Sequence, residues 1–231
     1  VIAGPDGYDV AIAPVPLGDP RSVDLKKLRV AFHTDNGIIS PTPETVTAVK
    51  TSAKVLSDAG AAVEENRPTE IEQGYEIWIG LLGADSGAGL QMLLQMIGTT
   101  ELSPFMQQSL RLARLQALST TDFMGLLYRC DVWRAAMLSF LDKYDVILCP
   151  VNAYPALLHG GTQSLGRLTS FSYTNVYNLT GWPGVVVRGG TSPGGLPIGI
   201  QVVARPWRED VALAAALYIE AASKGWQRPP L

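Results

Sequence analysis

The sequence predicts an α/β fold in which a mixed β-sheet is covered by helices on both faces. Three features of the 231-residue chain indicate this class. Residues 28–66 carry strand, helix and strand patterns in turn, which is a βαβ unit with a parallel pair. Residues 145–150 form an apolar strand, as expected of a strand covered on both faces. Residues 184–205 contain two β-rich runs across a Gly- and Pro-rich connection, which indicates an antiparallel pair.

The composition is that of a globular protein, with 47% hydrophobic and 17% charged residues. The net charge is −3 and the chain has no basic stripe, so we expect no nucleic-acid partner. The longest apolar runs are broken well short of the ~20 residues of a membrane-spanning helix, and residues 1–10 lack a signal-peptide pattern. We therefore expect no membrane partner and a cytoplasmic location. Two cysteines, Cys130 and Cys149, are too few for a disulfide framework and are expected to be buried free thiols.

The first part of the chain leads into the βαβ unit. Residues 1–27 are rich in Gly and Pro without a hydrophobic period, which predicts a surface loop packed across a larger body. A short strand is expected at residues 28–32. Thr42–Glu44 predicts a helix start, with Pro43 at the first helical position, and Gly60 predicts a left-handed helix end. A second strand is expected at residues 61–64.

Residues 70–98 have a helical pattern that is unusually rich in glycine. Glycine inside a helix costs ~1 kcal/mol relative to alanine and is tolerated where another group packs closely. The apolar residues of this segment, Trp78 and Leu82 among them, suit a core or a pocket wall, and core packing is the favoured reading. After this segment we expect a helix at residues 103–117 and a longer helix that begins at a cap, Thr121 or Asp122, and ends at Lys143. A loop is expected at residues 151–170. The final helix is expected at residues 210–223, with Val211, Ala215, Tyr218 and Ala222 on one face.

No common catalytic or metal motif stands out. Ser86 lacks the first glycine of a nucleophile turn, and two isolated histidines, His33 and His159, are usually structural or solvated. The chain has neither a Cys-x-x-Cys nor a His-x-x-x-His spacing, so we expect no metal. The loop at residues 189–195 lacks the Gly-Lys-Ser/Thr ending of a phosphate loop. No organic cofactor is expected either.

Several segments together resemble the C-terminal part of the amidase signature family. They are the NLTGWP turn at residues 178–183, the GLPIGIQ strand at 195–201 followed by an Ala/Leu helix, the YDVILCP strand at 144–150, and the AGPD loop at 3–6. The resemblance implies the mixed sheet described above. It also implies hydrolysis of carboxylic amides through a serine acyl-enzyme, with a Ser–cis-Ser–Lys triad.

The Gly/Ser-rich segment that carries the family's nucleophile is not found in this sequence, so no catalytic residue is assigned. We expect residues 1–231 to be the C-terminal portion of one such domain, inactive alone, whose partners are the missing N-terminal half and a small-molecule amide. Its expected parts are an entering loop at 1–27, the βαβ unit at 28–66, a helical substrate-side region at 70–143, and the closing strands and helix at 144–231.

Under this resemblance, substrate contacts are expected where loops leave strand ends. Tyr and Trp suit a pocket lining because they combine a large apolar surface with one polar atom. The candidate substrate-binding residues are Asn152, Tyr154, Tyr173, Thr174, Trp78 and Leu82, although ordinary core packing would explain the same residues equally well. Two alternatives stay open: a non-catalytic α/β binding or structural module, and assembly into a homo-oligomer.

Overall fold

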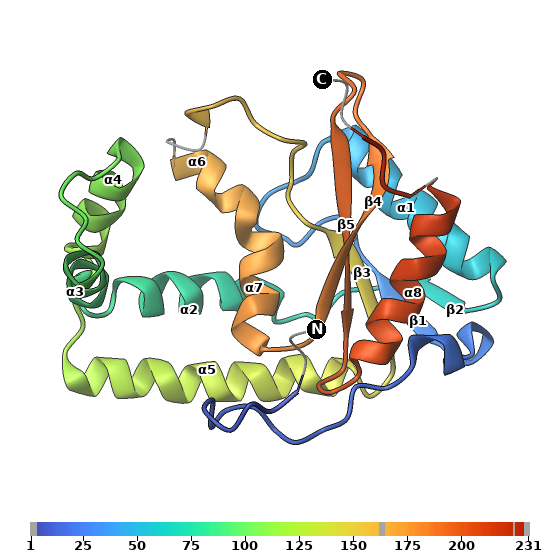
Figure 1. The fold of residues 1–231 in the computed structure, drawn as a ribbon, viewed down its shortest axis with the longest axis horizontal. Helices are drawn as coiled ribbons and strands as arrows, with labels where there is room; N and C mark the ends of the chain where they lie inside the picture. Colours follow the sequence, from blue (N-terminus) through green and yellow to red (C-terminus); the bar gives the residue numbers. More distant parts are fainter. Residues whose placement is uncertain (1–3, 162–164, 224, 229–231) are drawn as a thin grey trace.

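The computed structural model describes residues 4–161, 165–223 and 225–228. Five strands form one sheet in the order β2-β1-β3-β5-β4, and helices cover both faces (Figure 1). The strands are β1 (Arg29–Phe32), β2 (Ala62–Glu65), β3 (Val146–Pro150), β4 (Gly184–Thr191) and β5 (Pro197–Ala204).

The sheet is mixed, as the sequence predicts. Strand β1 runs parallel to β2 and β3, whereas β5 runs antiparallel to β3 and β4. Every residue of β3 is buried, which fits a central strand covered on both sides.

Two helical layers enclose the sheet. The helices and 3-10 turns of the described residues are η1 (Pro20–Ser22), η2 (Leu25–Lys27), α1 (Pro43–Asp58), α2 (Ile71–Gly83), α3 (Ala88–Met96), α4 (Pro104–Ala113), α5 (Thr120–Phe140), α6 (Leu165–Leu168), η4 (Thr169–Phe171), α7 (Ser172–Thr180) and α8 (Glu209–Ala222). Helices α1 and α8 pack on one face, and α2, α5 and α7 pack on the other (Figure 1).

The alternation of side chains along β3 divides the core into two clusters. Val146 and Leu148 belong to the cluster under α1 and α8. Ile147 and Cys149 belong to the cluster under α2, α5 and α7. Strand side chains point alternately to opposite faces, so one five-residue strand supplies both clusters. Ile198, Ile200 and Val202 on β5 share one face of the sheet, and all three lie in the first cluster.

Several predicted boundaries were wrong. Helix α5 is capped by Ser119, whose Oγ accepts a hydrogen bond from the Asp122 backbone N–H at 3.1 Å, and not by Thr121 or Asp122. The same helix ends at Phe140 rather than Lys143. Strand β4 continues to Thr191, because Gly190 lets the backbone approach helix α1; a Cβ there would lie 2.9 Å from Ala48 Cβ.

Helical segments were also misjudged in the middle and at the end of the chain. The helical region at 70–98 divides at Gly87, whose φ of 79° is left-handed, into α2 and α3. The expected loop at 151–170 contains α6 and the start of η4, and helix α4 ends at Ala113. Tyr218 is 51% exposed, because an Ala-rich helix gives little contrast between faces and α8 instead buries Ile219.

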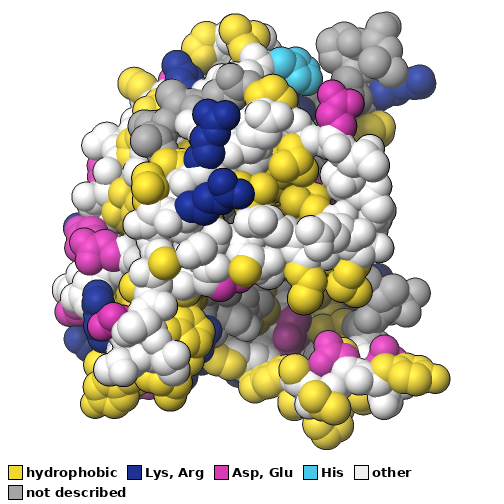
Figure 2. Space-filling view, turned by 90° about the vertical axis from the view of Figure 1, so that its left-hand side faces the viewer, with side chains coloured by type: hydrophobic (Ala, Val, Ile, Leu, Met, Phe, Trp, Pro, Cys, Tyr) yellow, Lys and Arg dark blue, Asp and Glu magenta, His cyan; other side chains and the backbone are white. Residues whose placement is uncertain are grey.

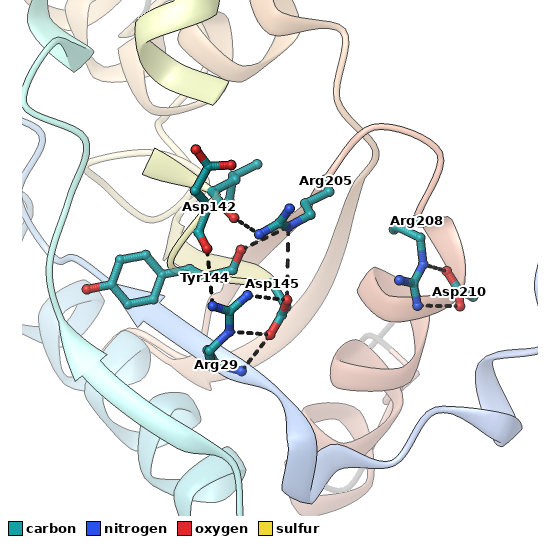
Figure 3. Close-up of polar contacts among 8 residues, drawn as sticks. Arg29, Asp142, Tyr144, Asp145, Arg205, Arg208 and Asp210 are labelled. Atoms are coloured by element: carbon teal, nitrogen blue, oxygen red, sulfur yellow. Dashed lines mark hydrogen bonds and ion pairs between the residues drawn. The ribbon is translucent and has the colours of Figure 1, made fainter. Parts of the chain in front are cut away.

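A network of charged side chains links the start of β1, the start of β3 and the end of β5 (Figure 3). Arg29, at the start of β1, donates from Nη2 and Nε to the two carboxylate oxygens of Asp145 at 2.9 and 3.1 Å. Arg205, just after β5, donates from Nε to the Tyr144 carbonyl oxygen at 3.2 Å. Burial opposes ionisation of Asp145, but the hydrogen bonds from Arg29 outweigh it and lower the pKa of that carboxyl.

Within the described residues, no single helix is long and apolar enough to cross a membrane. Helices α2 and α3 reach the required length and composition only as a pair, which is bent by 57°.

Candidate functional site

Three loops meet at the edge of the sheet formed by the carboxyl ends of β1 and β3. Residues 33–42 follow β1 and residues 151–161 follow β3, and both loops leave the same edge because the two strands are parallel. The turn at residues 192–196 reaches that edge from the other direction, because β5 is antiparallel. The Thr42 backbone N–H donates to the Ala153 carbonyl oxygen at 2.9 Å and ties the first two loops together. Ligands of open α/β sheets bind beside the carboxyl ends of the strands, so this edge is the place to look for a site.

A cleft of about 440 Å³ opens at this edge. Its walls are the loop at 151–160, the start of β5 at 197–199, and Phe171. Most of the lining is apolar, and the polar side chains in it are Asn152, Tyr154 and His159. The size and character fit a small-molecule pocket, which is typically ~300–1,000 Å³ and mostly apolar with a few polar groups.

Asn152 and Tyr154 are held by local contacts. The Asn152 Oδ1 accepts a hydrogen bond from the Tyr154 backbone N–H at 3.0 Å, which shapes the turn after β3. Asn152 belongs to the lining of the cleft, and among the described residues its amide NH₂ group has no hydrogen-bond acceptor. The Arg167 guanidinium lies 5.6 Å from the centre of the Tyr154 ring, within the range of a cation–π interaction.

Tyr173 and Thr174 lie behind the cleft and not in its lining. Tyr173 is fully buried, and its hydroxyl donates to the Ile39 carbonyl oxygen at 2.7 Å. Burial raises the pKa of this hydroxyl, so it stays protonated and remains a donor. The Thr174 hydroxyl donates to the Phe171 carbonyl oxygen at 3.0 Å. Tyr173 thus anchors the loop after β1, while Thr174 orders the backbone of a cleft residue.

A buried chain of polar side chains crosses the sheet beneath the cleft. The Gln201 side-chain amide on β5 donates to Cys149 Sγ at 3.4 Å, and the Cys149 thiol interacts with the Tyr177 hydroxyl. That hydroxyl lies 3.0 Å from His33 Nε2, and His33 Nδ1 lies 3.2 Å from the Asp35 carbonyl oxygen. The chain joins β5, β3, α7 and the end of β1, so it fixes the base of the loops that form the cleft.

Burial keeps this chain electrically neutral. It lowers the pKa of His33 to about 4 and raises the pKa of the Cys149 thiol to about 12. It also raises the pKa of Tyr177. Desolvation penalises the charged form of each group, so imidazole, thiol and phenol are all uncharged at neutral pH. None is poised as a nucleophile or base, and the chain is a structural element.

Comparison with known proteins decides the family. The sequence model of the family described as Amidase matches residues 1–213. The chain belongs to the amidase signature family. It is 26% identical to fatty-acid amide hydrolase 2-B of Danio rerio, covering 99% of this chain and 46% of the relative. It is 24% identical to an acylamidase of Rhodococcus erythropolis, covering 96% of this chain and 48% of the relative.

Solved structures give the same fold. The structure of 6-aminohexanoate cyclic dimer hydrolase aligns with a TM-score of 0.78 at 20% identity, covering 98% of this chain and 52% of that one. Fatty acid amide hydrolase aligns with a TM-score of 0.75 at 20% identity, covering 90% and 42%. The chain therefore spans about half the length of the amidase signature relatives it matches.

In this amidase signature chain, Trp78 and Leu82 lie on α2, away from the cleft. Trp78 is partly buried and stacks on Tyr75, with ring centres 5.9 Å apart, and Leu82 is 63% exposed. The structure thus brings Asn152 and Tyr154 together in one cleft, places Tyr173 and Thr174 behind it, and separates Trp78 and Leu82 from it. A group of three or more potential metal-ligating side chains is not found among the described residues.

Sequence reasoning missed Phe171 as a cleft residue and Tyr177 and Gln201 as members of the buried chain. Gln201 carried a usable signal, because a glutamine in an otherwise apolar strand must find hydrogen-bond partners. The sequence around Phe171 gives no such signal, because its place in the cleft depends on how η4 and α7 pack beside the loop after β3.

Proposed function

We propose that this chain is part of an amidase signature hydrolase that cleaves carboxylic amides, and that the cleft after β3 forms one wall of its acyl-binding pocket. The cleft itself is the observation that carries the proposal. It lies beside the carboxyl end of β3, is mostly apolar, and has the Asn152 side-chain amide in its lining.

In the proposed pocket each lining residue has a defined task. The Tyr154 and Phe171 rings contact the apolar part of the acyl group. The Asn152 amide donates a hydrogen bond to a carbonyl or other acceptor of the substrate. Tyr173 keeps the loop after β1 in place from behind.

The reaction would follow the family's acyl-enzyme route. A serine outside this chain would attack the amide carbonyl carbon, the amine would leave with a proton, and water would hydrolyse the resulting ester. Covalent catalysis of this kind divides one difficult step into two easier ones. The chain alone would then bind acyl groups weakly without cleaving them. A cytoplasmic location stays a prediction.

An acyl anilide tests the cleft directly. We expect titration of the purified chain with hexananilide to shift the backbone NMR signals of Asn152, Tyr154 and Phe171, with no aniline released. Tyr154→Ala should remove these shifts, whereas Tyr128→Ala, on the exposed face of α5, should retain them. Shifts centred elsewhere, or none at saturating anilide, would refute the assignment of the cleft; aniline release would refute the inactivity of the chain alone.

A further inference from the structure

The segment that builds the cleft contains no acidic residue. Residues 146–208 include four arginines and neither Asp nor Glu, whereas the whole chain has 21 acidic and 18 basic residues. Burial alone would remove charges of both signs, because Asp, Glu, Lys and Arg are all rarely buried. The segment keeps arginine at close to the density of basic residues in the whole chain, so the bias concerns the sign of the charge.

Three of the four arginines are engaged away from the cleft. Arg205 and Arg208 follow the end of β5 that lies away from the cleft, and both form ion pairs (Figure 3). The Arg188 Nη2 donates to a threonine hydroxyl of its own strand, β4, at 2.6 Å. Arg167 remains, and none of the ion pairs among the described residues includes it.

Arg167 lies next to the cleft. It belongs to α6 and is exposed. Its guanidinium carbon is 5.6 Å from the centre of the Tyr154 ring, and Tyr154 lines the cleft. His159 also lines the cleft, and the described lining residues include no Asp or Glu. The positive charge of Arg167 is therefore separated from the cleft by one aromatic ring and is not neutralised by a carboxylate of the lining.

The charges on this side of the molecule have the same distribution. Helix α6 lies in the upper half of Figure 1, and Figure 2 views the molecule from the left-hand side of Figure 1. In that view the His and several Lys or Arg side chains lie in the upper half, whereas most Asp and Glu side chains lie in the lower half or at the rim. An anionic ligand that approaches the upper half therefore meets few charges of its own sign.

We propose that the cleft takes acyl groups that end in a carboxylate, those of the monoamides of dicarboxylic acids, and that Arg167 binds this carboxylate. The inference rests on the proposed function and names its substrate class. The apolar walls accommodate the methylene chain, and the guanidinium forms a charge-assisted, bidentate pair with the carboxylate at the far end. An ammonium group in the same place lies beside Arg167 without a carboxylate partner in the lining, so cationic acyl groups are rejected.

Three anilides of matched acyl length test this class. Hexananilide ends in a methyl group, adipic acid monoanilide in a carboxylate, and 6-aminohexananilide in an ammonium group. Binding to the purified chain at low salt is measured through the backbone NMR signals of Tyr154 and Phe171, which line the cleft. Relative to hexananilide, we expect the dissociation constant to be at least about fivefold lower for the monoanilide and at least about fivefold higher for 6-aminohexananilide.

Substitution of Arg167 separates charge from shape. Arg167→Gln should abolish the preference for the monoanilide and leave the binding of hexananilide unchanged. Arg167→Lys should retain part of the preference, because it keeps the charge but loses the bidentate geometry. Arg111→Gln is the matched control, because Arg111 on α4 is exposed and lies outside the cleft. Added salt should weaken the preference for the monoanilide without weakening the binding of hexananilide.

The other outcomes overturn the inference. Equal binding of the three anilides, or the same preference in Arg167→Gln, overturns it and leaves the proposed function intact. Loss of hexananilide binding in Arg167→Gln also overturns it, because Arg167 would then act through the Tyr154 ring and not through its charge. Failure of every anilide to bind in the cleft removes the proposed function, and the inference with it.

Discussion

His33 Nε2 lies 3.0 Å from the Tyr177 hydroxyl oxygen, and His33 is only 3% exposed. His33 Nδ1 faces a carbonyl oxygen, that of Asp35, which can only accept, so Nδ1 carries the proton and Nε2 is the acceptor. The Tyr177 hydroxyl therefore donates to His33. This bond joins α7 to the end of β1 and fixes the loop that is tied to Ala153 beside the cleft.

Removing the Tyr177 hydroxyl should destabilise the fold. Tyr177→Phe leaves His33 Nε2 buried without a donor, and an unsatisfied buried acceptor costs about 1–3 kcal/mol. The measurement is the free energy of unfolding in urea. Tyr128→Phe is the matched control, because Tyr128 is 72% exposed and its change should stay within about 0.5 kcal/mol. Equal losses in the two variants would show that the bond adds nothing to stability.

Stability should fall as the pH is lowered from 6.5 towards 4. Burial lowers the pKa of His33 from the ordinary 6.5 to about 4 in the folded chain. The unfolded chain then binds one more proton than the folded chain inside this window, so the free energy of unfolding drops by about 1.4 kcal/mol per pH unit. Above pH 6.5 this contribution is complete.

His33→Gln separates this effect from other titrations. The variant lacks the titrating ring, so its free energy of unfolding should stay nearly level between pH 6.5 and 4. Five carboxyls have a lowered pKa and lose their contribution below this window: Asp6, Asp35, Asp85, Asp145 and Asp210. A slope of the same size in His33→Gln would mean that another group is responsible.

Both cysteines should resist thiol reagents in the native chain. Cys149 is fully buried and Cys130 is 2% exposed, and burial raises the pKa of each thiol. Only a thiolate attacks a disulfide reagent, so Ellman's reagent at pH 8 should report no reactive thiol before unfolding and two after it. Rapid reaction of either native thiol would contradict the packing of α5 or β3.

Replacement of two helical glycines by alanine should change the free energy of unfolding in opposite directions. A Cβ at Gly74 in α2 would lie 2.9 Å from Cε2 of the Trp133 ring, so Gly74→Ala should cost about 1–3 kcal/mol. A Cβ at Gly125 in α5 would meet nothing within 4 Å, so Gly125→Ala should gain about 0.5–1 kcal/mol. Thermal unfolding of both variants measures the two changes in stability. A more stable Gly74→Ala variant would show that Trp133 does not pack against α2.

The sequence predicted the sheet well because strand spacing and turn chemistry are local signals. The βαβ unit ending at Glu65 and the hairpin before Ala204 formed as expected. Gly199 on β5 lets the side chains of Val151 and Val186 approach the strand closely.

The candidate site was less accessible to sequence reasoning. Asn152 and Tyr154 could be placed in the cleft because they directly follow a strand end. Tyr173 could not be separated from them, because its place behind the cleft is set by the carbonyl oxygen of Ile39, 134 positions away along the chain. Such long-range partners depend on how α7 packs, which local pattern does not determine.

Fluorophosphonate treatment of the purified chain, read by intact mass, tests the central claim most directly. We propose that the nucleophilic serine lies outside this chain, so the mass of 24.8 kDa should remain unchanged while a serine hydrolase in the same reaction is labelled. A single adduct that maps to a serine of this chain, and is lost on unfolding before treatment, would contradict the account.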